Sequence, residues 1–234
     1  MKKMIMMFLM MVGVMAHASS ADYNVRDYGA KGDGKTLDHQ AINAAIDSCV
    51  AHGGGRVVVP AGTYLCGSIR MKSHVELHLS AGAKILAAPA SMKAYDEAES
   101  WEGPAYQDGG HTYFKNSLIY AIGQEHVSVT GRGMIDGQGL TKKDTEKGGV
   151  VNGGNIGTGD KAIAFKLCRN ILIRDVTIYR GGHFAIILTG CELGTVDNVT
   201  IDTNRDGFDI DCCKYLSVSN CKINTPRDDA LVLK

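Results

Sequence analysis

The sequence predicts an all-β fold, namely a right-handed parallel β-helix whose N-terminal end is capped by a helix. Three observations lead to this prediction: short stretches of alternating apolar residues, a repeat with a period of about 22 residues in the second half of the chain, and one amphipathic helical pattern near the N-terminus. A repeat of this length with several short strands is typical of a solenoid, in which each strand pairs with its equivalent one coil away. Leucine-rich repeats share the period, but their leucine pattern is absent from the chain.

Composition restricts the class of protein. The chain has 234 residues with 25 basic and 25 acidic side chains, and 44% of its residues are hydrophobic. That hydrophobic fraction is sufficient for a core and excludes wholesale disorder. The balanced charge argues against nucleic acid as a partner, because nucleic-acid-binding proteins carry a basic surplus.

The segment from Met1 to Ala18 has the pattern of a secretory signal peptide. Lys2 and Lys3 precede an apolar run from Met4 to Val14, and Ala16-His17-Ala18 supplies the small residues of a cleavage site. The run is too short to span a bilayer, which takes about 20 residues. We therefore expect residues 19–234 to form a single β-helix domain that is secreted or periplasmic and has no membrane-spanning segment.

One helix is predicted, directly after a glycine-rich segment. Gly29 to Thr36 fits the nucleotide-binding pattern G-x-x-x-x-G-K-[ST], but that loop follows a buried strand, and the preceding residues are polar. We interpret the segment as a turn, with Thr36 or Asp38 capping the helix. The helix ends at Gly53–Gly55 and carries one apolar stripe at helical spacing, formed by Ala41, Ile42, Ala45, Ile46, Cys49 and Val50.

Strands are predicted beyond the helix, first at residues 56–59 and 75–79. Three later segments align with one another and begin at Cys168, Cys191 and Cys213. Their apolar residues alternate, which predicts strands stacked about 4.8 Å apart from coil to coil. The three cysteines should then form one column of thiols. The chain has seven cysteines and no C-x-x-C pair, so we expect buried thiols, no zinc site and no cofactor, with any disulfide pairing left open.

The candidate catalytic residues are carboxylates one coil apart. Asp206, the pair Asp228–Asp229 and His183 each follow the preceding predicted strand at the same spacing, so we expect them in one column at a strand edge. Like charges about 5 Å apart should raise the pKa of at least one carboxyl. A protonated carboxyl beside an ionised one is what glycoside hydrolysis requires. The alternative is turn chemistry, because Asp and Asn favour β-turns. Asp209 either supports the site by hydrogen bonding or stabilises the turn.

These motifs resemble those of the polygalacturonase family, glycoside hydrolase family 28, in the pectin-lyase-like superfamily. Asn204 to Asp209 resembles its N-T-D-G-x-D motif and Asp228–Asp229 its D-D motif, while Tyr23 to Gly34 resembles the N-terminal signature of the superfamily. The resemblance covers nearly the whole chain after Ala18. It implies Asp228 as the general acid, with Asp206 and Asp229 holding and deprotonating a water that attacks with inversion.

The resemblance also implies substrate contacts and shows departures. Asn204, Arg205 and His183 are the candidate substrate-binding residues. Arg205 stands where the family often has Thr, and His183-Phe184 where it often has a Pro-x-Trp-like segment. The family's later H-G and R-I-K motifs do not occur before Lys234, so we expect a C-terminally truncated member. The implied partner is a pectic polysaccharide or oligosaccharide, bound by a monomer.

Two long segments, residues 88–116 and 136–160, interrupt the repeat and are predicted to be inserted loops on the binding face. The aromatic residues of the first loop either stack on sugar rings or belong to an ordinary surface loop: Tyr95, Trp101, Tyr106 and Tyr113. Two functional alternatives remain. One is a β-eliminating pectate-lyase-type enzyme, which would need a calcium cluster and a basic proton abstractor. The other is a non-catalytic carbohydrate-binding β-helix or an inactive fragment.

Overall fold

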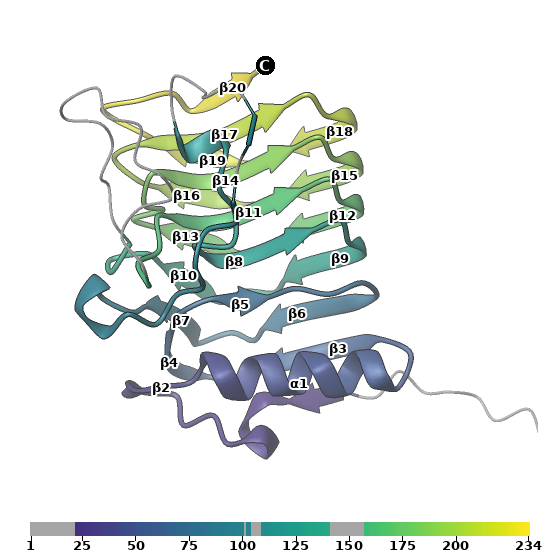
Figure 1. The fold of residues 1–234 in the computed structure, drawn as a ribbon, viewed down its shortest axis with the longest axis vertical. Coiled ribbons are helices and arrows are strands. Elements are labelled where there is room, and N and C mark those ends of the chain that lie inside the picture. Colours follow the sequence, from purple (N-terminus) through teal and green to yellow (C-terminus); the bar gives the residue numbers. More distant parts are fainter. Residues whose placement is uncertain (1–21, 101, 104–108, 141–156) are drawn as a thin grey trace, which may run out of the picture.

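The chain forms a parallel β-helix, as predicted. The structure, a computed structural model, describes residues 22–100, 102–103, 109–140 and 157–234. Each full coil contributes one strand to each of three parallel sheets, and the coils stack in chain order from the N-terminal helix to the C-terminal end (Figure 1). The predicted signal peptide, residues 1–18, lies outside the described residues. In the described ranges, no helix is long and apolar enough to cross a membrane.

The three sheets take their strands in a regular order. Sheet A consists of β1 (Asp22–Asn24), β3 (Gly55–Val59), β6 (Val75–Leu79), β9 (Glu125–Thr130), β12 (Arg169–Arg174), β15 (Glu192–Asp197) and β18 (Lys214–Ser219). Sheet B consists of β2 (Asp33–Leu37), β4 (Gly62–Cys66), β7 (Ala83–Ala87), β10 (Met134–Asp136), β13 (Thr177–Tyr179), β16 (Thr200–Asp202) and β19 (Lys222–Asn224). Sheet C consists of β5 (Ile69–Arg70), β8 (Ser117–Ile122), β11 (Lys161–Lys166), β14 (Phe184–Thr189), β17 (Asp206–Asp211) and β20 (Leu231–Leu233).

The register of sheet A confirms the repeat. Ile173 of β12 pairs with Val196 of β15, which pairs with Val218 of β18, so equivalent positions of successive coils recur at the spacing seen in the sequence. The side chains of Ile173 and Val196 are buried in the main core. Because equivalent positions stack, an apolar residue in one coil packs on an apolar residue in the next, and the core continues along the whole β-helix.

The cysteine column is also present. The backbone amide of Cys191 donates a hydrogen bond of 3.3 Å to the Sγ of Cys213, and Cys168 occupies the equivalent position one coil earlier. All seven cysteines are free thiols, and Cys168 and Cys191 are buried. The interpretation of these residues as stacked thiols is therefore confirmed.

Helix α1 (His39–Ala51) lies across the N-terminal end of the coils, below β3 in Figure 1. Its inward stripe is Ile42, Ala45, Ile46 and Cys49, all buried, which confirms the predicted cap. The predicted capping bond is wrong. Asp38 is at the N-cap position, but its carboxylate accepts hydrogen bonds from the amides of Lys31 and Gly32 at 2.7 and 2.9 Å. Asp38 thus fixes the glycine-rich turn that matches a nucleotide-binding loop.

Sheet C departs once per strand from the regular alternation of inward and outward side chains. In β14, Ala185 and Ile186 both belong to the main core, whereas Phe184 and Ile187 belong to a separate apolar cluster on the outer face. Adjacent residues of a regular strand point to opposite faces. The interruption therefore brings the first and fourth residues of the strand to the same, outer face. In β17 the residues at these two positions are Asp206 and Asp209.

Candidate active site

The predicted carboxylates lie together at the edge of sheet C. Phe208 of β17 pairs with Leu231 of β20, which places Asp229 in register with Asp206. The backbone amide of Asp229 donates hydrogen bonds of 3.2 Å to Oδ1 of both Asp206 and Asp228. One carboxylate oxygen from each of the three lies within 4.8 Å of the other two. We call Asp206, Asp228 and Asp229 the aspartate trio.

His183 does not share the column of Asp206, so that prediction is wrong by one residue. The residue in register with Asp206 is Phe184. Four residues separate β13 from β14, whereas three separate β16 from β17. A count from the end of the preceding strand that reaches Asp206 in one coil therefore reaches His183, one residue before Phe184, in the coil before it. His183 is instead buried beside the trio's column, with its ring edge-on to Phe184 at a centroid distance of 4.3 Å.

The other two predicted substrate-binding residues differ in their surroundings. Arg205 directs its guanidinium to the trio, where its Nε lies 3.2 Å from Oδ2 of Asp228. Asn204 is exposed in the turn before β17, and no hydrogen bond joins its side chain to the described part of the chain. Arg205 is therefore close to the candidate acid, whereas Asn204 faces solvent.

The trio carries the perturbed pKa that the sequence predicts, and it falls on Asp206. Burial raises the pKa of Asp206 to about 7, assisted by a hydrogen bond with Asp228 and by the negative charges of Asp209 and Asp228. Asp206 is therefore the carboxyl of the trio that holds a proton as neutral pH is approached.

A second group of charged side chains adjoins the trio. The Nδ1 of His111 lies 2.7 Å from Oδ2 of Asp211, and the Nζ of Lys234 lies 2.8 Å from Nε2 of His111. The same ammonium lies 3.5 Å from Oδ1 of Asp209, which is fully buried. Asp209 in turn affects the pKa of Asp206 through its charge, so the two groups are continuous. We call His111, Asp209, Asp211 and Lys234 the lysine group.

The lysine group is what sequence reasoning missed. Asp209 and Asp211 were visible in the motif, but His111 comes from the interrupting loop, 100 residues from Asp211. A signal for the outward position of Asp206 was present in the pairs of adjacent apolar residues that recur at the start of sheet C strands: Leu118–Ile119, Ala162–Ile163 and Ala185–Ile186. Such pairs mark the interrupted alternation.

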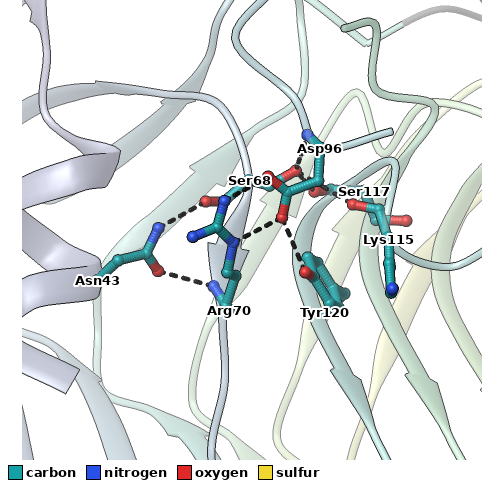
Figure 2. Close-up of polar contacts among 7 residues, drawn as sticks. All are labelled: Asn43, Ser68, Arg70, Asp96, Lys115, Ser117 and Tyr120. Atoms are coloured by element: carbon teal, nitrogen blue, oxygen red, sulfur yellow. Dashed lines mark hydrogen bonds and ion pairs between the residues drawn. The ribbon is translucent and has the colours of Figure 1, made fainter. Parts of the chain in front are cut away.

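The loop at 88–116 begins with η2 (Ala90–Met92), contains η3 (Gly109–His111), and is fastened to the base of sheet C (Figure 2). Arg70 of β5 donates hydrogen bonds of 2.7 and 2.6 Å to Asp96, which also accepts one of 2.8 Å from Tyr120. The Ser68 hydroxyl accepts from the amide of Asp96 and lies 3.2 Å from the carbonyl of Lys115. Both ends of the loop are thus held at one place, which we call the Asp96 anchor.

From the anchor the loop crosses the outer face of sheet C. Phe114 is buried against Ala164, Phe184 and Ile187, and three residues earlier His111 reaches the lysine group. Tyr95 is also buried and donates a hydrogen bond to the carbonyl of Ala88, so it belongs to the loop's own packing. Trp101 and Tyr106 lie outside the described residues.

Among the residues that the structure describes, two sets of side chains have the spacing to hold a metal ion: the aspartate trio, and His111 with Asp209 and Asp211. Three carboxylates in the trio are the hard oxygen ligands that Ca²⁺ or Mg²⁺ prefers. In the second set the ammonium of Lys234 already lies among the ligand atoms and supplies the positive charge there. The trio is therefore the better fit for a divalent cation.

Known proteins are similar to most of this chain. A family model described as rhamnogalacturonase A/epimerase, pectate lyase-like, matches residues 23–228. An exopolygalacturonase of Platanus acerifolia is 25% identical over 221 residues, which cover 90% of this chain and 52% of that protein. An exo-poly-alpha-D-galacturonosidase of Dickeya chrysanthemi is 34% identical over 137 residues, covering 55% of this chain and 21% of that protein.

A similar solved structure also belongs to an exopolygalacturonase. The hyperthermoactive exopolygalacturonase of Thermotoga maritima is 26% identical, with a TM-score of 0.77 over 92% of this chain and 55% of that one. The chain thus spans about half, or less, of the length of these three proteins. The resemblance to polygalacturonases and the predicted right-handed β-helix are both confirmed. Because the family match runs through all three sheets and includes Asp206 and Asp228, the chain belongs to the rhamnogalacturonase A/epimerase, pectate lyase-like family.

Proposed function

We propose that the protein is a glycosidase that hydrolyses α-1,4-galacturonosyl or related pectic glycosidic bonds. The observation that carries this proposal is the aspartate trio, in which three carboxyls lie together and the pKa of one of them, Asp206, is raised to about 7. Glycoside hydrolysis needs both forms at once, one to protonate the leaving oxygen and one to activate water. The similarity to polygalacturonases supports a pectic substrate.

In the proposed mechanism Asp228 is the general acid, and Asp206 and Asp229 hold and deprotonate the attacking water, which gives inversion. One oxygen of each carboxylate in the trio lies within 4.8 Å of the others. The carboxyl groups of inverting enzymes are usually farther apart, at about 6.5–9.5 Å. The water is therefore held by Asp206 and Asp229 from one side. In this proposal the proton held at Asp206 passes along its hydrogen bond to Asp228, which gives it to the leaving oxygen, and the ionised Asp206 then accepts a proton from the attacking water.

The first test is hydrolysis of polygalacturonate by the full chain and by Asp228→Asn. We expect the wild type to release reducing ends and the variant to lose about 10³-fold in rate, because no acid remains to protonate the leaving group. Asp202→Asn is the matched control, since that exposed aspartate of β16 can still accept its bond from Asn224 as an amide. Full activity in Asp228→Asn would refute the assignment.

The stereochemical test follows the first product by NMR. Appearance of the inverted anomer supports water attack assisted by Asp206 and Asp229. Appearance of the retained anomer would instead require a covalent intermediate on one of the trio's carboxylates, for which the short spacing would be suitable.

A β-eliminating enzyme is the second candidate, because three clustered carboxylates could hold a divalent cation and the family description includes pectate-lyase-like proteins. Such an enzyme would form an unsaturated, ultraviolet-absorbing product and lose activity when a chelator is added. Hydrolysis that is insensitive to chelator, without an unsaturated product, excludes it. Binding of oligogalacturonide without any turnover would instead favour the non-catalytic alternative.

We further propose that residues 1–18 are a signal peptide and that residues 19–234 act outside the cytoplasm as a monomer. The pattern of the first residues and the extracellular nature typical of pectic substrates support this proposal. The mass of the exported chain tests it: cleavage after Ala18 supports the assignment, and an intact N-terminus in the exported protein contradicts it. Light scattering of that chain tests the monomer.

A further inference from the structure

We propose that a cavity on the outer face of sheet A is a second, non-catalytic binding site for an acidic saccharide, remote from the aspartate trio. The cavity has a volume of about 520 Å³, within the range of about 300–1,000 Å³ usual for small-molecule sites. Its lining residues include Arg56, Glu76, His78, Thr130, Arg132 and Arg174. The inference goes beyond the proposed function, because no step of the hydrolysis uses this face.

The cavity forms because β9 carries short side chains where its neighbouring strands carry longer ones. Glu76 and His78 of β6 are in register with Ser128 and Thr130 of β9. Thr130 is in turn in register with Arg174 of β12. Residues in register point to the same face of a sheet, so the longer side chains of β6 and β12 form two walls with the short side chains of β9 between them.

Arg132 is added to this cavity by an enlarged turn. Three residues join β9 to β10, with Arg132 in the middle, whereas two residues join β12 to β13. The turn begins at Gly131, whose φ is +99° and where a Cβ would lie 2.2 Å from the carbonyl oxygen of Leu79, so only glycine fits. The Arg132 side chain is exposed, and in the described ranges no hydrogen bond or ion pair joins its guanidinium to another residue. Its donors are therefore available to a ligand.

The other two arginines of the cavity differ in how firmly they are held. Arg56 donates hydrogen bonds of 2.8 and 2.6 Å to the two carboxylate oxygens of Asp22, so its charge is already paired. Arg174 has one longer contact, in which its Nε lies 3.4 Å from Oδ2 of Asp175, and half of its side chain, 50%, is exposed. Arg132 and Arg174 are therefore the two guanidiniums that can bind an incoming carboxylate, a group that arginine recognises with paired hydrogen bonds.

The wall formed by β6 offers hydrogen-bond acceptors instead. The hydroxyl of Thr130 donates to Oε1 of Glu76, and it lies 3.0 Å from Nδ1 of His78. Because the only hydroxyl proton of Thr130 goes to Glu76, Nδ1 of His78 must be the donor of the second bond. The neutral His78 ring then accepts at Nε2, and Oε2 of Glu76 is a further acceptor.

The two walls together match one class of ligand. A carboxylate fits the side of Arg132 and Arg174, and hydroxyl groups fit the acceptors of Glu76 and His78. An acidic saccharide carries both groups. A bare inorganic anion would gain from the guanidiniums but would be repelled by the carboxylate of Glu76, so we expect it to bind less tightly.

The cavity and the aspartate trio lie at different corners of the coils. Arg132 lies where the chain passes from sheet A to sheet B, whereas Asp206 and Asp228 lie where it passes from sheet B to sheet C. The cavity also belongs to the coils of β6, β9 and β12, below β17 and β20 in Figure 1. One chain can therefore bind saccharide at both places, and a long polymer held at the cavity would be concentrated near the trio.

The experiment measures binding by calorimetry, with every protein carrying Asp228→Asn so that turnover does not interfere. The probes are an oligogalacturonate, its fully methyl-esterified form and inorganic sulfate. We expect two binding events for the oligogalacturonate when the cavity is intact. Arg132→Gln/Arg174→Gln should weaken one event about 10- to 100-fold, the range of a charged hydrogen bond, and leave the other within about twofold. The ester and sulfate should both bind the cavity more weakly than the acid form.

Arg169→Gln is the matched control, because it removes the same charge from β12 at an exposed position that pairs with Glu192 outside the cavity lining. It should change neither binding event. Arg132→Gln alone should weaken the cavity event with an unchanged unfolding transition, since its guanidinium has no partner to lose.

A single binding event when the cavity is intact, unchanged binding in the double variant, or an equal loss in Arg169→Gln overturns the inference. Sulfate that binds as tightly as the oligogalacturonate also overturns it, because the site would then recognise any small anion. The outcome is separate from the proposed function. If the chain without Asp228→Asn hydrolyses nothing but the double variant still loses one binding event, the proposed function fails and the inference stands.

Discussion

The outer face of sheet C has two halves that share one backbone geometry and differ in chemistry. In the coils of β8, β11 and β14, one outward column consists of Tyr120, Ala164 and Ile187, and Phe114 packs over it. In the coil of β17 the same column holds the buried carboxylate of Asp209. The backbone thus supplies equivalent outward positions in every coil, and the residue placed there decides between packing and chemistry.

The next outward column changes in the same way. It runs from Ile122 through Lys166 and Thr189 to Asp211, with Lys234 after it. We call the outer face over β8, β11 and β14 the apolar half, and the outer face over β17 the polar half. Phe114 of the loop packs on the apolar half, and this contact places His111 at the polar half. This division predicts that substitutions in the apolar half act on stability and those in the polar half on pH response and binding.

The largest effect on stability is expected from Phe114→Ala. This ring is fully buried against Phe184 and Ile187, and loss of a buried Phe costs about 3–5 kcal/mol of the free energy of unfolding. Chemical denaturation of the full chain measures it. Tyr113→Ala, at a half-buried neighbouring position, should cost less than about half as much. Equal costs at the two positions would show that the loop is not held by the apolar half.

A smaller, pH-dependent effect is expected from Asp206→Asn. The pKa of Asp206 is about 7 when folded and about 4 when unfolded, so between these values the unfolded state binds fewer protons. Stability contributed by this site is therefore present at low pH and lost as pH rises toward 7. The variant should gain up to about 4 kcal/mol over the wild type at pH 8, since one pKa unit is worth about 1.4 kcal/mol, and nothing at pH 3.

Thermal unfolding across that pH range tests the prediction, with Asp202→Asn as the control. A gain that is the same at every pH would contradict a raised pKa at Asp206. For the proposed hydrolysis the same titration predicts that the rate declines as pH rises above about 7, where Asp206 loses its proton.

The smallest effect is expected from Tyr120→Phe at the Asp96 anchor. The change removes one hydrogen bond of 2.8 Å while Arg70 continues to hold Asp96 with two. We expect a loss of about 1 kcal/mol in the free energy of unfolding, with hydrolysis unchanged. Tyr179→Phe, on sheet B, should cost less. A large loss of activity in Tyr120→Phe would mean that the anchor controls the polar half more tightly than its contacts indicate.

The fold and the main carboxylates were predictable because both depend on local, repeated spacing. The regular offset between coils places Asp229 in register with Asp206, and the alternation places the core. His183 was displaced by one because turn lengths between coils are unequal. His111 was not predictable, because a long insertion fixes its place through Phe114 and the Asp96 anchor rather than through the repeat.

The loop also limits how the β-helix can change in length. Phe114 packs on β14, and His111 contacts Asp211 of β17, one coil further. The three residues from His111 to Phe114 therefore span the spacing between two neighbouring coils, about 5 Å. A duplicated coil between β14 and β17 could preserve strand pairing, yet it would double that gap to about 10 Å, close to the limit of three extended residues. The loop thus fixes the distance between β14 and β17. Insertions of a whole coil should be tolerated elsewhere along the solenoid, but not between these two strands.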